Sequence, residues 1–188
     1  MIIQIRGTSG SGKSTIVKEL MKQYQWTPIY ETGRKLPIGY EAPHKQGKII
    51  VLGHYEPSAK CGGLDTIKNG LDHIDKLYRS LGATDNTVIL SEGLFQSYEF
   101  NRTILLDTVR VVFLTTSIEE CLERVRRRRV ENGNLSPLNE HQTRSKFRSV
   151  ELCRQRLINA GIDCRRMSQD QATKAVSKWV EEFCESRR

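Results

Sequence analysis

The sequence contains no apolar run close to the ~20 residues that a membrane-spanning helix needs, and it has no low-complexity segment or internal repeat. It also begins without the basic leader and apolar stretch of a secretory signal, since Ile2, Ile3 and Ile5 already give a strand pattern. Hydrophobic residues make up 37% and charged residues 28% of the 188 residues, which is typical of a globular protein. We therefore expect a soluble, cytoplasmic protein without a membrane partner, folded as a single domain over residues 1–188.

Cysteine is sparse, and acidic side chains are outnumbered by basic ones. The five cysteines show no CxxC pair and no metal-ligand spacing, which favours reduced thiols over a disulfide framework or a zinc site. Thirty Lys and Arg against 22 Asp and Glu give a net charge of +8. This charge is explained equally by nucleotide phosphates, by a larger anionic partner or by solubility, so it identifies no partner by itself.

Strand-like and helix-like segments alternate along the chain. This alternation predicts an α/β fold in which a doubly wound, five-stranded parallel sheet binds its ligands at the carboxyl ends of the strands. The expected strands are 1–6, 26–30, 87–90, 109–114 and 162–167, and the expected helices include 13–24, 64–81, a long helix that ends at Gly161, and 169–185. A shorter helix is expected around Phe100, Ile104 and Leu105.

Residues 33–60 interrupt this alternation. They contain several prolines and a β-branched run at Ile49–Val51, which we expect to pair with residues 38–40 as a β-hairpin inserted after the second strand. Downstream, Ser117 and Glu120 form a capping box that predicts the start of another helix.

A glycine-rich turn between the first strand and the first helix matches G-x-x-x-x-G-K-[ST] in full. Glycines let backbone N–H groups turn toward phosphates, the helix N-terminus adds its positive dipole end, and the lysine reaches the terminal phosphates. The match lies in the strand–turn–helix context that the P-loop motif requires, so we expect it to bind ATP, with Ser14 as a magnesium ligand. The expected nucleotide-binding residues are Gly7, Thr8, Ser9, Gly10, Ser11, Gly12, Lys13, Ser14 and Thr15.

Three carboxylates are predicted near strand or helix ends, where the cleft should lie. Glu92 follows an apolar strand, so it is a candidate either to hold magnesium through water or to accept the proton of a substrate hydroxyl. Glu31 and Asp65 are the other candidate bases, although helix capping explains Asp65 equally well. Arg34, three residues after Glu31, is a candidate to bind an anionic substrate, with a solvated loop arginine as the alternative.

Five arginines occur late in the helix that begins after Ser117. At 3.6 residues per turn, Arg124, Arg127 and Arg128 share one face, so they are candidates for a helical lid that stabilises the transferring phosphate. We take Arg124 and Arg128 as the catalytic candidates. For any single arginine, a solvated helix C-terminus is the competing explanation.

The P-loop, the strand that ends in Ser91-Glu92-Gly93 and the arginine-rich helix together resemble the P-loop kinase superfamily over nearly the whole chain. There is no N-K-x-D signature of a GTPase. The resemblance therefore implies a kinase that uses ATP and Mg²⁺ and has an alcohol group as acceptor.

Residues 33–40, 52–56 and 61–66 resemble a narrower group of small phage-encoded P-loop kinases. Some members of this group phosphorylate 5-hydroxymethyluracil within DNA during thymine hypermodification. The resemblance implies that DNA is the acceptor, that the site of action is the host cytoplasm, and that Asp65, Glu31 or Glu92 is the base.

An enzyme that acts on a base inside DNA needs basic and aromatic side chains near its site. The candidate substrate-binding residues are Arg34, Lys35, Tyr40, His54 and Tyr55, and basic side chains of the long helix between 140 and 160 extend this path. The competing explanation is that the tyrosines pack the hairpin onto the core.

The leading hypothesis is therefore transfer of the γ-phosphoryl group from ATP to a hydroxyl of a nucleic acid, most sharply 5-hydroxymethyluracil in DNA. Two alternatives remain at this point. The acceptor is instead a free nucleotide, nucleoside or small metabolite, or the chain is a nucleotide-binding module that transfers nothing.

Overall fold

The structure is a computed structural model, and it describes residues 1–45, 47–56, 62–67, 71–82, 86–94, 103–104, 106 and 108–185. Among these residues no helix is long and apolar enough to cross a membrane. The elements in chain order are β1 (Ile2–Arg6), α1 (Lys13–Met21), β2 (Thr27–Ile29), β3 (Gly39–His44), β4 (Gly47–Leu52), η1 (Gly63–Thr66), α2 (Leu71–Leu81), β5 (Thr87–Gly93), β6 (Val109–Leu114), α4 (Ile118–Glu131), α5 (Glu140–Asn159), β7 (Asp163–Met167) and α6 (Gln169–Glu185).

The seven strands in the described part of the chain form one sheet in the order β2-β3-β4-β5-β1-β6-β7. The strands β4, β5, β1, β6 and β7 run parallel, whereas β3 is antiparallel to both β2 and β4. The first strand, β1, lies between β5 and β6. The strands β2 to β5 lie on one side of β1, and the later strands β6 and β7 lie on its other side. A doubly wound sheet binds its ligands at such a switch point, outside the carboxyl ends of the strands. The P-loop leaves β1 at this point.

The predicted α/β fold with five parallel strands is confirmed, but one of the five is not the strand expected. Residues 26–30 were predicted as a core strand, whereas β2 lies at the sheet edge, where Pro28 costs no ladder hydrogen bond. The core position beside β5 belongs to β4, whose Ile49, Ile50 and Val51 are fully buried. The expected hairpin exists, because Tyr40 of β3 pairs with Val51 of β4, and it extends the sheet instead of standing apart from it.

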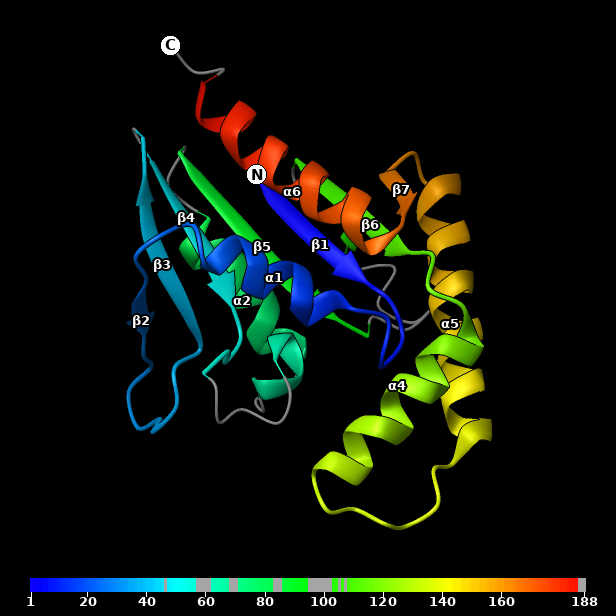
Figure 1. The fold of residues 1–188 in the computed structure, drawn as a ribbon. Helices are drawn as coiled ribbons and strands as arrows, with labels where there is room; N and C mark the ends of the chain where they lie inside the picture. The colour runs from blue at the N-terminus through cyan, green and yellow to red at the C-terminus, as the bar shows by residue number, and fades with distance from the viewer. Residues whose placement is uncertain are drawn as a thin grey trace.

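Helices cover both faces of the sheet (Figure 1). Apolar residues of α1 and α6 pack on one face, with Ile3 and Ile5 of β1 beneath them. Residues of α2 and α5 pack on the other face, with Ile50 and Ile89 beneath them. Because apolar side chains meet both faces of the central strands, these strands read as nearly continuous hydrophobic runs.

The end of α4 and the loop that follows it extend beyond the sheet, and α5 returns alongside (Figure 1). The predicted start of α4 is confirmed, since the Ser117 side chain accepts a hydrogen bond from the Glu120 backbone N–H. At the end of α5, Gly161 has a φ of 76°, which favours glycine and stops the helix as expected.

The single helix predicted over 64–81 is wrong in its first part. Leu64 lies in the short 3-10 helix η1, and α2 begins at Leu71. Gly63 has a φ of 73°, and a Cβ there would lie 2.4 Å from the Glu92 carbonyl oxygen. This close, left-handed approach to β5 is incompatible with an α-helix. The short helix expected around Phe100, Ile104 and Leu105 falls mostly outside the described residues.

Candidate active site

The P-loop forms a tight turn between β1 and α1 that only glycine can make at two positions. Gly10 and Gly12 have φ values of 84° and 99°. A Cβ at Gly10 would lie 2.5 Å from the Cys121 carbonyl oxygen, so α4 packs directly on the loop. No side chain caps the N-terminus of α1 at Gly12. The first N–H groups of α1 are therefore available for an anion such as phosphate.

A cavity of about 510 Å³ opens on one side of this loop. From the P-loop it is lined by Ser9, Gly10, Gly12, Lys13, Ser14 and Thr15, and from other elements by Gly62, Asp65, Glu92, Arg124, Arg127, Arg128 and Glu131. We call this cavity the active-site pocket. The remaining predicted P-loop residues, Gly7, Thr8 and Ser11, line a separate cavity of about 290 Å³ on the other side of the loop.

Lys13 lies at the floor of the active-site pocket, with its side chain almost fully buried. Its Nζ donates to the Thr8 carbonyl oxygen at 3.1 Å. Burial lowers the pKa of Lys13, while the nearby carboxylates of Glu92 and Asp65 raise it in part. The ammonium thus shares the pocket with two carboxylates that partly compensate its burial.

Glu92 comes from β5, the strand next to β1, and only 2% of its surface is exposed. Its Oε1 accepts a hydrogen bond from the Ser14 hydroxyl at 2.5 Å. Burial raises the pKa of Glu92, and Lys13 and the Ser14 hydrogen bond oppose this rise. The carboxylate that sequence reasoning placed at a strand end therefore meets the P-loop serine at the first turn of α1.

Asp65 reaches the same pocket from η1. Helix capping, the alternative explanation for this residue, is not seen at η1: its N-cap is Gly62, and no side chain makes a cap hydrogen bond there. Gly62 and Gly63 let the segment approach Glu92 and Tyr55 closely, since a Cβ at Gly62 would lie 2.7 Å from the Tyr55 ring. Asp65 and Glu92 thus enter the pocket from different elements.

Three arginines of α4 line the pocket opposite these carboxylates. Arg124, Arg127 and Arg128 share one helix face, as their spacing predicted. The Arg124 Nη1 donates to the Gly10 carbonyl oxygen at 3.4 Å, and Arg128 lies near enough to Lys13 to lower its pKa. By contrast, Arg126 pairs with Glu140 of α5.

Glu31 and Arg34 lie beside the pocket and not among the residues that line it. Glu31 forms an ion pair of 2.9 Å with His73 of α2. Arg34 Nη2 donates to the Thr66 carbonyl oxygen at 3.3 Å, next to Asp65. The β2–β3 loop, residues 30–38, is therefore tied to both α2 and η1, while Lys35 on the same loop is exposed.

The three aromatic candidates for substrate contact are buried. Tyr40, His54 and Tyr55 are each less than 10% exposed. The Tyr40 hydroxyl lies 3.2 Å from His54 Nδ1 and accepts from the Tyr55 backbone N–H at 3.4 Å. Tyr40 and Tyr55 pack in the core with Ile49 and Val51 of the hairpin, which is the competing explanation given above.

The Tyr55 hydroxyl is buried without a hydrogen-bond partner among the described residues. Burial and then the neighbouring Glu92 carboxylate raise the pKa of Tyr55 well above its usual value. Tyr55 therefore lies close to Glu92 without a hydrogen bond of acceptable geometry to it.

The donor set in the pocket fits a magnesium ion. Mg²⁺ prefers oxygen ligands and keeps several waters, so one or two protein oxygens beside substrate phosphates are sufficient. The Ser14 hydroxyl and the Glu92 carboxylate supply two such oxygens. Within the described ranges, no group of three or more His, Cys, Asp or Glu residues that could form an all-protein metal site is found.

Sequence reasoning missed three residues at or beside the pocket. Glu131 lines it one turn beyond Arg127 and Arg128, so helical spacing alone would have found it. Gln169 packs on the P-loop, since a Cβ at Gly12 would lie 2.3 Å from its Oε1. Nothing in the sequence pattern indicated this contact or the pairing of His73 with Glu31.

The sequence is similar to the sequences of phage proteins. No family model matches the chain. A protein named "5-hmdU DNA kinase" from Pseudomonas phage PaMx11 is 37% identical over 188 residues, covering 96% of this chain and 97% of the relative. A second protein of that name, from Delftia phage PhiW-14, is 28% identical over 172 residues, covering 86% of this chain and 65% of the relative. The chain therefore spans slightly less than two thirds of the second relative.

Solved structures that align with the chain, with TM-scores under 0.5, include kinases. A deoxyadenosine kinase from M. mycoides, with products bound, aligns with a TM-score of 0.48 at 16% identity and covers 100% of both chains. A shikimate kinase from Aquifex aeolicus aligns with a TM-score of 0.43 at 19% identity and covers 99% of both chains.

A phosphate-binding loop that faces carboxylates and arginines across one pocket is an arrangement for phosphoryl transfer, and the sequence relatives are named kinases. The protein is a phosphotransferase of the P-loop kinase class, with a hydroxyl group as acceptor. Because the identity of 37% extends over 96% of its length, the chain belongs to the family of the phage 5-hmdU DNA kinases.

Proposed function

We propose that this protein transfers the γ-phosphoryl group of ATP to the hydroxymethyl group of 5-hydroxymethyluracil in DNA. The observation that carries the proposal is the convergence of Lys13, the Ser14–Glu92 pair and Asp65 on one pocket, in a chain whose relatives are named for this substrate. We further propose that residues 1–188 act as a single domain, since α1, α2, α5 and α6 all pack on one sheet.

The P-loop side of the pocket binds the donor. Backbone N–H groups around Gly10 and Gly12 and the ammonium of Lys13 hold the β- and γ-phosphates. Arg124 and Arg128 approach from α4 and stabilise the charge that spreads over the transferring group. Arg124 is already held against the P-loop by its hydrogen bond to the Gly10 carbonyl oxygen.

Ser14 and Glu92 are the residues that would hold magnesium. When bound, the ion would neutralise phosphate charge. This role fits Glu92 better than that of general base, because its carboxylate is only 2.5 Å from the Ser14 hydroxyl and is almost fully buried.

Asp65 then remains as the carboxylate that orients the acceptor. It lines the pocket from η1, across from the P-loop. The acceptor hydroxyl oxygen forms a bond to the γ-phosphorus while the bond from that phosphorus to the β–γ bridging oxygen breaks. ADP leaves with the bonding electrons, and the hydroxyl proton passes to the Asp65 carboxylate. We propose that Glu31, held by His73, positions the segment beside Asp65 and does not touch the acceptor.

The test offers γ-labelled ATP to the protein with a panel of acceptors. The panel contains DNA with 5-hydroxymethyluracil, the same DNA with thymine, RNA, and free 5-hydroxymethyldeoxyuridine and its nucleotide. We expect label only in the hydroxymethyluracil DNA, with a rate that falls steeply as salt rises because counterions compete for the polyanion. Label in the free nucleosides or nucleotides that salt does not reduce would instead assign a small-molecule kinase. ATP binding without label in any acceptor would indicate a non-catalytic module.

A further inference from the structure

Exposed apolar side chains gather on two loops that flank the active-site pocket. Among the described residues, the exposed large hydrophobic side chains include Tyr30 (55%) and Leu36 (51%) on the β2–β3 loop. They also include Val130 (63%) at the end of α4 and Leu135 (83%) in the α4–α5 loop, residues 132–139. Both loops lie at the lower end of the molecule in Figure 1, with α2 between the β2–β3 loop and α4. This placement separates them from the exposed Leu152 and Ile158 of α5.

Hydrogen bonds hold the α4–α5 loop in the shape that presents Leu135. Arg129 Nη2 donates to the Asn134 side-chain oxygen at 3.1 Å and to the Ser136 carbonyl oxygen at 2.9 Å. The Ser136 N–H also donates to the Asn134 side chain, at 3.2 Å. The residues on both sides of Leu135 are therefore fixed, while Leu135 itself contacts mainly solvent.

The β2–β3 loop is held in a similar way. Its ends are joined by the Ile38 N–H, which donates to the Ile29 carbonyl oxygen at 2.8 Å. Glu31 pairs with His73, and Arg34 donates to Thr66 beside Asp65. The tip thus presents Tyr30 and Leu36 next to the element that carries Asp65.

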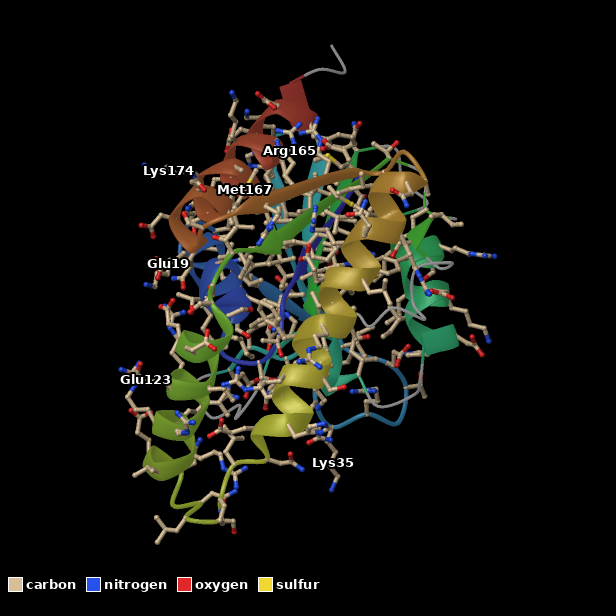
Figure 2. All side chains as sticks on the ribbon, turned by 90° about the vertical axis from the view of Figure 1, so that its right-hand side faces the viewer. Glu19, Lys35, Glu123, Arg165, Met167 and Lys174 are labelled. Atoms are coloured by element: carbon tan, nitrogen blue, oxygen red, sulfur yellow. The ribbon has the colours of Figure 1, made fainter. Side chains whose placement is uncertain are left out.

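Basic side chains lie near both tips, and near the second tip Arg127 also pairs with Glu131, which is itself 64% exposed. Arg34 and Lys35 belong to the first loop, and Lys35 points away from the body of the molecule at the same lower end as α4 (Figure 2). Arg127 is 72% exposed on α4, close to the second loop. Apolar tips beside cations fit a polyanion with apolar interior faces, and duplex DNA has this chemistry: phosphates outside and stacked bases within.

In-line transfer brings the acceptor hydroxyl to the γ-phosphate at the P-loop, and enzymes that act on a base of a duplex bring it into such a site by moving it out of the stack. Proteins that extrude or kink DNA insert apolar side chains such as Leu or Phe between base steps and hold the backbone with Lys and Arg. From the position of the two tips, we propose that Leu135 and the pair Tyr30 and Leu36 are the wedge that enters duplex DNA and holds the target base out of the stack. This inference rests on the proposed function and deepens it.

The test compares duplex DNA containing one 5-hydroxymethyluracil with the same strand alone. In Leu135→Ala and in Tyr30→Ala/Leu36→Ala, we expect kcat/KM on the duplex to fall about tenfold or more, because unstacking a step costs a few kcal/mol. On the single strand, which needs no extrusion, the same variants stay within about twofold of the unsubstituted protein. Leu152→Ala and Ile158→Ala on α5 are the matched controls, and we expect no change with either substrate.

A second measurement reports extrusion without phosphoryl transfer. A 2-aminopurine placed beside the target base brightens when it is unstacked. We expect brightening with the unsubstituted protein and its loss in the Leu135 and Tyr30/Leu36 variants. Equal losses on duplex and single strand, or brightening that persists in both variants, would overturn the wedge. Brightening that depends on Leu135 without any labelled product would instead refute the proposed function and leave the wedge standing.

Discussion

The two halves of the active-site pocket are built differently. The core of the donor half is one continuous segment, in which β1, the P-loop and the start of α1 supply their atoms from neighbouring positions, and Glu92 and the α4 arginines add to it. The acceptor half is assembled from η1 and, beside it, α2 and the β2–β3 loop, through contacts such as Arg34 with Thr66 and Glu31 with His73. Local spacing therefore describes the donor half, whereas the acceptor half depends on the packing of segments that are distant in the sequence. Variants that affect one half and spare the other test this difference.

The largest effect is expected in the donor half. Lys13→Ala removes the ammonium at the floor of the pocket, so we expect kcat/KM for ATP to fall about 1000-fold, since charged groups aimed at the transferring phosphate carry much of the catalysis. Steady-state kinetics measure this loss. Lys18→Ala, on the exposed face of α1, is the control and should retain full activity. An active Lys13→Ala protein would remove the P-loop from the mechanism.

In the acceptor half, Asp65→Asn keeps the shape of the side chain and removes its basicity. We expect kcat to fall about 100-fold with little change in the KM for ATP, as for loss of a general base. Glu31→Gln, which weakens the pair with His73, should lower kcat by about tenfold or less, because Glu31 does not line the pocket. Reversal of this order, measured under saturating ATP, would assign the base to Glu31.

The helix α4 carries arginines on the face that lines the pocket and on a face directed away from it. One substitution on each face tests whether only the first contributes to catalysis. Arg128→Ala, inside the pocket, should lower kcat about tenfold, equivalent to about 1.4 kcal/mol of transition-state stabilisation. Arg126→Ala, whose guanidinium pairs with Glu140 away from the pocket, should leave kcat unchanged. Equal losses in the two variants would mean that α4 contributes only through its charge.

The buried Glu92 makes the stability of the nucleotide-free protein depend on pH. Burial raises the pKa of Glu92, so between its ordinary and its raised pKa the folded protein binds more protons than the unfolded chain. The free energy of unfolding therefore falls as pH rises through this window. Relative to Glu92→Gln, the unsubstituted protein should become more stable as pH is lowered from neutral toward the ordinary glutamate pKa of about 4.3. Urea unfolding at a series of pH values measures the difference, and a difference that grows with pH instead would contradict the assignment.

The smallest effects are expected on stability, from removal of the hydroxyl group of either of two buried tyrosines. Tyr78→Phe removes a hydroxyl that lies 2.6 Å from Ser91 Oγ and should cost about 1 kcal/mol of stability. Tyr55→Phe removes a hydroxyl with no hydrogen-bond partner among the described residues, so stability should be unchanged or slightly higher. Thermal unfolding of the two variants side by side measures both, and a larger loss in Tyr55→Phe would show that its hydroxyl is bonded in solution.

The sequence predicted what depends on neighbouring residues. The P-loop, the cap at Ser117 and the bounds of α6 are local, and Glu92 was found because it follows the apolar run Val88, Ile89 and Leu90. The prediction was wrong where the packing of distant segments determines which strand is central in the sheet. The run Ile49–Val51 is buried on both faces and forms a central strand, a pattern typical of parallel sheets, whereas Pro28 already indicated an edge strand.

The acceptor side was predicted less well for the same reason. Gly63 brings η1 against Glu92 and ends any helical continuation of α2, although the apolar spacing from Leu64 onward is helical. Tyr40, His54 and Tyr55 were candidates for substrate contact because they are near basic residues, with packing of the tyrosines onto the core as the alternative. They are buried, and the Tyr40 hydroxyl bonds with His54 and with the Tyr55 backbone N–H.

The identity of the atom that receives phosphate tests the central claim most directly. The protein would be incubated with γ-labelled ATP and duplex DNA containing 5-hydroxymethyluracil, and the DNA would be digested to nucleotides with nucleases alone, without a phosphatase. The account predicts that the label is on the hydroxymethyl oxygen of the modified uracil and is missing from matched thymine DNA. Label on the 5′ ends of both DNAs, or only on free nucleotides, would contradict it.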